Sequence, residues 1–189
     1  MDRLSAGQKL AVTGTTQLGG SATLSGANIT TGGTTTVSGA LNATAQNTLD
    51  LSAGQLTVVK DATLTGTNVS TGGALIGGNL TANASKQLTT GGSNTSVQGA
   101  ANLTGTNGVT NTSSVLSGGP LTVTGANVTN GAGANLISTA ATTVNATDVN
   151  NAGSIAGLTT AVTANGSLTN NNGAIIGTNA LNVATGTCQ

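Results

Sequence analysis

The residues of this sequence that could do chemistry are few and lie far apart. Its acidic residues are four Asp, and it contains no Glu and no His. Cleavage of a polysaccharide needs two or more carboxylates, or a carboxylate with a cation, converging on one substrate. The single cysteine, Cys188, has no His partner for thiol catalysis and no second Cys for a disulfide or a Cys-rich metal site. We therefore predict that the chain is not an enzyme and holds neither a metal nor a cofactor.

The charges of the chain balance and are sparse. Arg3, Lys9, Lys60 and Lys86 offset the four Asp to a formal net charge of zero, and charged residues make up 4% of the sequence. A nucleic-acid surface needs several cations to displace phosphate counterions, so we expect no nucleic-acid partner. Because no run of 18 or more apolar residues occurs, we also expect no membrane span.

The composition points to an ordered chain with a thin core. Phe, Tyr and Trp, which dominate ordinary globular cores, are absent, and 30 residues are Gly. Disordered chains usually combine low hydrophobicity with high net charge, whereas here Val, Leu and Ile recur on a regular schedule.

Apolar residues recur about every 20 residues in three columns, which indicates the stacked coils of a solenoid. The first column consists of apolar-x-apolar pairs, whose second members include Leu24, Leu64, Leu103, Val123 and Val144, and whose eighth pair is Val162 and Ala164. The second column is Ile29, Leu49, Val69, Leu88, Val109, Val128, Val149 and Leu168. The third is looser and contains Val37, Leu56, Val97, Ile155 and one member each of Leu75–Ile76, Val115–Leu116, Leu136–Ile137 and Ile175–Ile176, where we favour Ile175.

Glycines mark a corner between the second and third columns. They are Gly33, Gly54, Gly73, Gly92, Gly131, Gly153 and Gly173. Glycine accepts positive φ without steric cost, which suits a sharp turn that recurs in every coil.

The columns together predict one architecture. Side chains alternate along a strand, so each apolar column points into a common bore, and parallel connections within a sheet are overwhelmingly right-handed. We predict an all-β, right-handed parallel β-helix of about nine coils with three short strands per coil, forming a rod of roughly 45 Å. We interpret residues 1–189 as one repeat segment of a longer rod, with coils over about residues 4–187 and a two-coil unit of about 40 residues.

The predicted rod keeps the carboxylates apart. Asp50 and Asp61 fall on different sides of a coil, and Asp148 lies nearly five coils from Asp50, roughly 23 Å along the axis. The Asp residues therefore do not converge on one substrate.

The repeats also resemble a known family. Stretches such as LTVTGANVTNGAGANLIS, ITTGGTTTVSGALNATA and GSLTNNNGAIIGTNALNVATG, with the Asn-Asn-x-Gly-x-Ile phrase at residues 150–155 and its counterpart at 171–175, are similar to the filamentous haemagglutinin-type repeats of bacterial two-partner-secretion exoproteins. That family includes large adhesins and the stick-like proteins of contact-dependent growth inhibition. The resemblance covers essentially the whole chain.

The resemblance implies a β-helical shaft that is secreted or displayed on the bacterial cell surface. Such a shaft carries a distal binding or toxic domain. The implied partners are neighbouring coils of the same longer chain, an outer-membrane transporter during export, and a receptor on a host or neighbouring cell. The sequence does not choose between a passive spacer and an adhesive surface, although without aromatic rings for stacking we expect the isolated segment to bind glycans weakly or not at all.

An ice-binding β-helix is the alternative from a different class. Outward positions beside the first column carry Thr at Thr23, Thr44, Thr63, Thr65, Thr81, Thr104, Thr122, Thr124, Thr143 and Thr163. Ice-binding β-helices use Thr-x-Thr ladders of this kind, but here Asn interrupts the Thr in most coils, and Thr is favoured on any solvated strand face.

Overall fold

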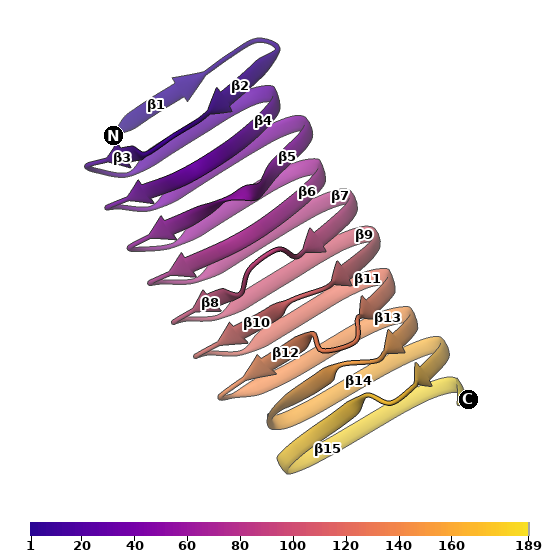
Figure 1. The fold of residues 1–189 in the computed structure, drawn as a ribbon. Helices are drawn as coiled ribbons and strands as arrows, with labels where there is room; N and C mark the ends of the chain where they lie inside the picture. Colours follow the sequence, from indigo (N-terminus) through magenta and orange to yellow (C-terminus); the bar gives the residue numbers. More distant parts are fainter. Residues whose placement is uncertain (189) are drawn as a thin grey trace.

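The chain is an all-β parallel solenoid. The computed structural model describes residues 1–188, in which parallel strands stack into about nine coils of roughly 20 residues, as predicted (Figure 1). The strands are β1 (Asp2–Ser5), β2 (Lys9–Val12), β3 (Thr16–Leu18), β4 (Ala22–Val37), β5 (Leu41–Val58), β6 (Ala62–Ile76), β7 (Leu80–Thr90), β8 (Thr95–Val97), β9 (Ala101–Asn111), β10 (Ser114–Ser117), β11 (Leu121–Asn130), β12 (Asn135–Ser138), β13 (Ala141–Asn151), β14 (Ser154–Asn170) and β15 (Ala174–Cys188).

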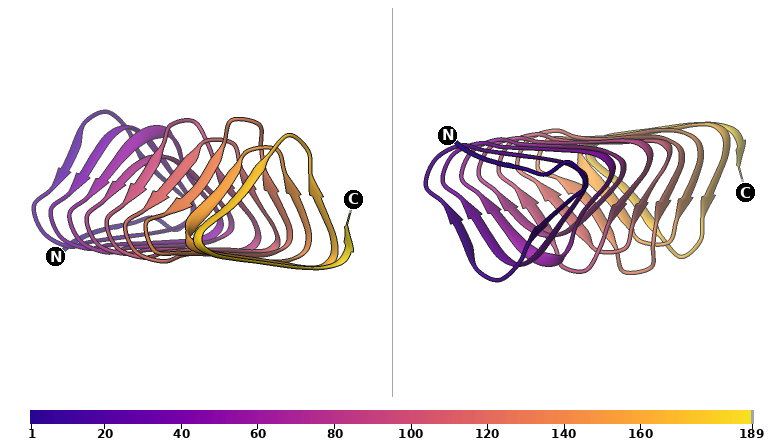
Figure 2. Two further views of the ribbon diagram at one scale, coloured as in Figure 1. Left: turned by 90° about the horizontal axis from the view of Figure 1, so that it is seen from below. Right: turned by 90° about the horizontal axis from the view of Figure 1, so that it is seen from above.

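The coils follow one another along a single axis. In Figure 1 the chain winds in a right-handed sense from the N-terminus at one end of the rod to the C-terminus at the other. The views of Figure 2 show the same ordered stack of open coils. Because successive coils pair directly, each part of the chain contacts only the coils before and after it.

Each coil has three sides, but the strands run across the corners. In the N-terminal half, β4, β5 and β6 each pass around almost a whole coil, whereas between residues 80 and 138 a long strand alternates with a short one, as β9 does with β10, before the long strands β13, β14 and β15. Gly91-Gly92-Ser93 and the turn around Gly131 interrupt the hydrogen bonding there. The three predicted sides are therefore present, with fewer and longer strands than one strand per side.

The pairing register shows how coils of unequal length stack. On the first side, Leu24 pairs with Leu4 and Ala43, and on the second Ile29 pairs with Leu10 and Leu49. Extra residues are absorbed at corners, where the pairing of β5 with β6 skips between Thr44 and Thr48. The columns therefore stay in line although the spacing along the sequence varies.

The core is the set of inward columns. Two sets of predicted core residues, one per side, are buried: Leu24, Leu64, Leu103, Val123 and Val144 on the first side, and Ile29, Leu49, Val69, Leu88, Val109, Val128, Val149 and Leu168 on the second. On the third side Ile155 is buried, and Ile175 in the last coil is partly buried against the core.

The third side has two inward columns where the sequence suggested one. Val37, Val58, Ile76 and Val97 form one stack, and Leu56, Ala74, Val115, Leu136 and Ile155 belong to the other. On this side each strand has two inward positions separated by one residue, and the single column predicted from the sequence combined residues from both stacks. Their outward neighbours Leu75 and Leu116 are 48% and 40% exposed.

The register of the eighth coil differs from the sequence interpretation. Val144 pairs with Val162 rather than with Ala164, so Thr160 and Val162 form the inward pair. Thr160 can be buried at this position because its hydroxyl donates to the carbonyl oxygen of Ile176 at 2.6 Å. Ala164 pairs with Ala146 in a third inward column of small residues next to the corner.

The corner glycines divide into two kinds. Gly33 and Gly92 adopt positive φ, at 81° and 79°, whereas near Gly131 and Gly173 the left-handed residues are Gly133 and Asn172. Gly54 pairs with Gly33, while Gly73 pairs with Gln55, one residue further on. Gly153 and Gly173 are required for close approach instead, because a Cβ at either would overlap the preceding coil.

Candidate functional site

The carboxylates of Asp50, Asp61 and Asp148 accept hydrogen bonds from nearby polar groups and do not converge on one site. Asp50 accepts hydrogen bonds from Ser52, and Asp61 accepts one from the backbone N–H of Asn79 at 2.7 Å. Asp148, on another part of the rod, accepts hydrogen bonds from Ser167. Among residues 1–186, whose side chains the structure describes, no group of three His, Cys, Asp or Glu side chains is placed to hold a metal ion.

The environment of Asp148 changes its titration. The hydroxyl of Ser167 donates to Oδ1 at 2.7 Å, and the backbone N–H of Ser167 donates to the same oxygen at 2.9 Å. These two hydrogen bonds, the side-chain one first, lower the pKa of Asp148 below its ordinary value. The arrangement fastens the coil of Ser167 onto the coil of Asp148.

The outer face of the first side carries two regular polar columns. The first includes Thr23, Thr63, Thr81, Thr122 and Thr143, with Asn42, Asn102 and Ala161 between or after them. The second includes Thr44, Thr65, Thr104, Thr124 and Thr163, with Asn83 and Asn145 interrupting. Thr163 therefore belongs to the column of Thr124, because of the altered register of the eighth coil, and Ala161 takes the place beside Thr143.

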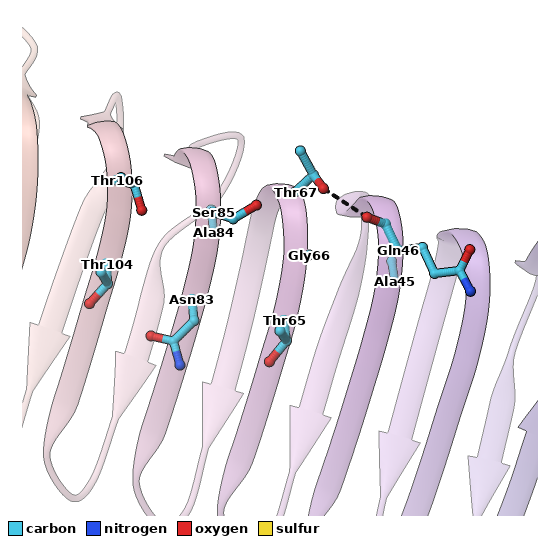
Figure 3. A pocket seen from close by; sticks show the side chains of 10 residues that line it. All are labelled: Ala45, Gln46, Thr65, Gly66, Thr67, Asn83, Ala84, Ser85, Thr104 and Thr106. Carbon is cyan, nitrogen blue, oxygen red and sulfur yellow. Dashed lines mark hydrogen bonds between the residues drawn. The ribbon is translucent and has the colours of Figure 1, made fainter.

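A groove follows the corner next to this face. Figure 3 shows its floor of Ala45, Gly66 and Ala84, with Thr65, Asn83 and Thr104 on one wall and Gln46, Thr67, Ser85 and Thr106 on the other. The groove has a volume of about 430 Å³, and a second groove of about 240 Å³ adjoins it at Gln46. Thr67 donates its hydroxyl to the backbone carbonyl of Gln46 at 2.7 Å. Hydroxyls and amides line the groove, so it offers neutral hydrogen bonds and no acid or base.

The outer face of the third side has a different character. Leu75, Leu116, Ile137 and Ile176 point outward from successive paired strands, with Ser96 and Ala156 between them. Leu158 at the neighbouring corner is 52% exposed. The rod thus presents a hydroxyl- and amide-rich face on the first side and an aliphatic one on the third.

A ladder of buried asparagines is the main feature that sequence reasoning missed. Asn111, Asn130 and Asn151 are fully buried, and their side chains form hydrogen bonds from coil to coil as far as Asn170. Each of the four lies two residues after a member of the second apolar column, on the same inward face. That spacing is visible in the sequence, but Asn is typical of turns, so the sequence alone does not indicate that these side chains form an inward ladder.

Comparisons with family models, curated proteins and solved structures found no match to this chain. The described residues include no helix with the length and apolar character needed to span a membrane. The backbone of Cys188 pairs with Leu168, which places this residue at the end of the second column, while its side chain lies outside what the structure describes.

Proposed function

We propose that the chain is a shaft segment of a secreted or surface-exposed bacterial filament, an adhesin or toxin-delivery stick, that holds a distal functional domain away from the cell. The observation that carries the proposal is the unbroken stacking of the inward columns from Leu4 to Val183. A solenoid built this way mainly supplies length along one axis. The scattered, locally bonded carboxylates support a role without catalysis.

The repeats support the extracellular setting through their resemblance to filamentous haemagglutinin-type exoproteins. On this proposal the chain passes through an outer-membrane transporter, its coils continue those of a longer chain, and any receptor lies on a host or neighbouring cell. A solubilising face that carries little charge, as on the first side, suits a long rod exposed to the medium.

Surface localisation gives the test of this proposal. Antibodies raised against the purified chain should label intact cells of the bacterium that makes it, and protease added outside should remove the label. A cytoplasmic protein of the same cells serves as the control and should resist the protease. Labelling that requires permeabilised cells would contradict the shaft role.

Binding measurements separate a spacer from an adhesive segment. We expect the fluorescently labelled chain to show no saturable binding to host cells, bacterial cells or glycans, because its outer faces contain no aromatic ring and few charges. Saturable binding that unlabelled chain displaces would replace the spacer role with an adhesive one.

Ice binding is the second candidate, favoured by the two outward columns of the first side. Thr63 and Thr65 lie side by side there with Thr44 and Thr81 in the adjacent coils. On this alternative the purified chain shows thermal hysteresis that is lost on Thr63→Leu with Thr65→Leu. The same change at Thr36 and Thr57, which point outward from the third side, should leave the hysteresis intact.

A further inference from the structure

One inward column changes its chemistry partway along the rod. The column contains Leu51, Thr71, Thr90 and Asn111, each paired with the next, and continues through Asn130 and Asn151 to Asn170. It stands at the end of the second side, just before the corner. From Thr90 onward the buried polar side chains of this column have hydrogen-bond partners, whereas the hydroxyl of Thr71 has none within the described residues.

From Thr90 onward the side chains form a continuous hydrogen-bonded chain. Thr90 donates its hydroxyl to Oδ1 of Asn111 at 2.6 Å. Nδ2 of Asn111 then donates to Oδ1 of Asn130, and Nδ2 of Asn130 to Oδ1 of Asn151, both at 2.8 Å. Asn151 completes the series by donating to Asn170 at 2.7 Å. Five side chains thus link five coils in one direction.

The second proton of each amide ties the same coils at the corner. Nδ2 of Asn111 also donates to the backbone carbonyl of Asn135 at 3.1 Å, and Nδ2 of Asn130 to that of Ser154 at 3.1 Å. Nδ2 of Asn151 repeats the pattern with Ala174. A buried polar network in which every member has partners is rigid and specifies one arrangement.

The coils before Thr90 lack this network. The hydroxyl of Thr71 is buried and has no hydrogen-bond partner within the described residues, and the same holds for Thr35. The core beside Thr71 also contains a void too small to hold a water molecule, lined by Leu51, Leu56 and Ala74 among others. Unpaired buried hydroxyls destabilise a fold locally, and the lining of such a void loses packing contacts.

We propose that the rod consists of two cooperative units that separate at the junction between β6 and β7. Under destabilising conditions the coils up to about residue 79 open first, and the coils joined by the asparagine ladder stay folded. The inference rests on the one-dimensional character of a solenoid, in which stability is a sum of terms within and between adjacent coils. A local deficit is then not shared by the whole chain. Whatever the function of the rod, this junction is where the unfolded coils should separate from the folded ones.

Hydrogen exchange of the full chain tests the proposal directly. Amides in β9, β11 and β13 should exchange at least ~10-fold more slowly than those in β4 and β5 at low denaturant concentration, because they open only with the more stable unit. Uniform protection along the rod, or slower exchange in β4 and β5, would overturn it.

Two substitutions distinguish the proposed cause from mere fraying of the N-terminal end. Thr71→Val keeps the shape of the side chain and removes the unpaired hydroxyl, so protection in β5 and β6 should rise several-fold and the difference between the units should shrink. Thr65→Val, on the outer face of the same strand, is the matched control and should change these rates less than ~2-fold. Equal effects of the two variants would contradict the role of Thr71.

One substitution in the asparagine ladder, with a matched control outside it, tests whether the ladder stabilises the C-terminal unit. Asn130→Ala should lower protection in β11 and β13 at least ~10-fold, bringing the two units together, since it removes the side-chain acceptor of Asn111 and the donor to Oδ1 of Asn151 and to the carbonyl of Ser154. Asn102→Ala removes an outward Asn of β9 and should have little effect. If both variants behave alike, the ladder does not define the stable unit. If Asn130→Ala fails to fold, the Thr71→Val comparison still decides the proposal.

Discussion

At the residue scale, the bore of this solenoid tolerates polar side chains because most of them donate a hydrogen bond, several to a backbone carbonyl. Thr142 donates to the carbonyl of Ala156 at 2.6 Å, Thr95 to that of Gly72 at 3.1 Å, and Ser138 to that of Gly119 at 2.8 Å. Small hydroxyl residues can therefore alternate with Leu and Val in a column. This explains how a chain without aromatic residues builds a continuous core.

The aliphatic positions of the same columns should nevertheless carry most of the stability. Leu103 is 1% exposed between Ala82 and Val123, so Leu103→Ala leaves a cavity that these neighbours cannot close, and should cost about 2 to 5 kcal/mol of unfolding free energy. Leu75→Ala, at a residue on the outer face, should cost less than about 0.5 kcal/mol. Urea denaturation followed by circular dichroism measures both, and equal losses would contradict the assignment of inward and outward faces.

The corner glycines should differ sharply in their tolerance of a methyl group. A Cβ at Gly153 would overlap the carbonyl oxygens of Ala134 and Gly131, so Gly153→Ala should be severely destabilising. Gly32 has open space around it and no positive φ, and Gly32→Ala should be neutral or stabilise by about 0.4 to 1 kcal/mol. Thermal melts of the two variants compare them directly. Two variants of similar stability would show that the coils do not approach as closely at Gly153 as described.

Asp148 should give the rod a measurable sensitivity to acid. Its pKa is lowered in the folded chain by the hydrogen bonds from Ser167, so its contribution is present above the unfolded pKa of about 4 and is lost as the pH falls through the lowered folded value. The melting temperature of Asp148→Asn should therefore fall less than that of the unchanged chain between pH 5 and pH 2. Asn102→Ala, which removes an outward side chain that does not ionise, is the control and should keep the full pH dependence. A parallel fall in Asp148→Asn and the unchanged chain would contradict this role.

At the scale of the strands, regular columns could be predicted from the sequence and corners could not. The second column was complete because Ile29 and its successors are always aliphatic and always in the same place on their side. The eighth coil was misplaced because Thr160 is polar, and only the structure shows that the carbonyl of Ile176 accepts its hydroxyl proton. The asparagine ladder could not be predicted for the same reason, because Asn is expected in turns and its burial depends on partners in other coils.

The corners should also absorb changes of length that the strands cannot. Inserting one Gly after Ala132, in the exposed turn between β11 and β12, should cost little, because natural coils already vary in length at their corners. Inserting one Gly after Thr122, within β11, shifts the rest of that side of the coil by one residue and turns Val123 outward, which should abolish native folding of that coil. Circular dichroism and limited proteolysis distinguish the two variants. Equal tolerance would show that the register is not set by the inward columns.

At the scale of the whole molecule, the rod is uneven in charge as well as in its core. Seven of the eight Asp, Lys and Arg residues lie within the first 86 residues, and Asp148 is the eighth. The C-terminal half therefore depends on hydroxyls and amides for its contact with water, and it also presents the aliphatic row of Leu116, Ile137 and Ile176. The surface of this half is therefore polar almost without charge.

The length of the rod should follow the number of coils. Ala22 and Ala62 occupy the same column two coils apart, both paired with Leu41, so a second copy of residues 22–61 inserted after Asp61 would continue every inward column. Small-angle scattering should then show a rod lengthened by about 10 Å at an unchanged cross-section, since each coil adds one strand spacing of about 4.8 Å. An insert of the same composition in scrambled order is the control and should instead give a disordered loop. If the repeated insert widens the particle or leaves its length unchanged, the coils do not stack additively, and a shaft whose reach is set by repeat number would lose its physical basis.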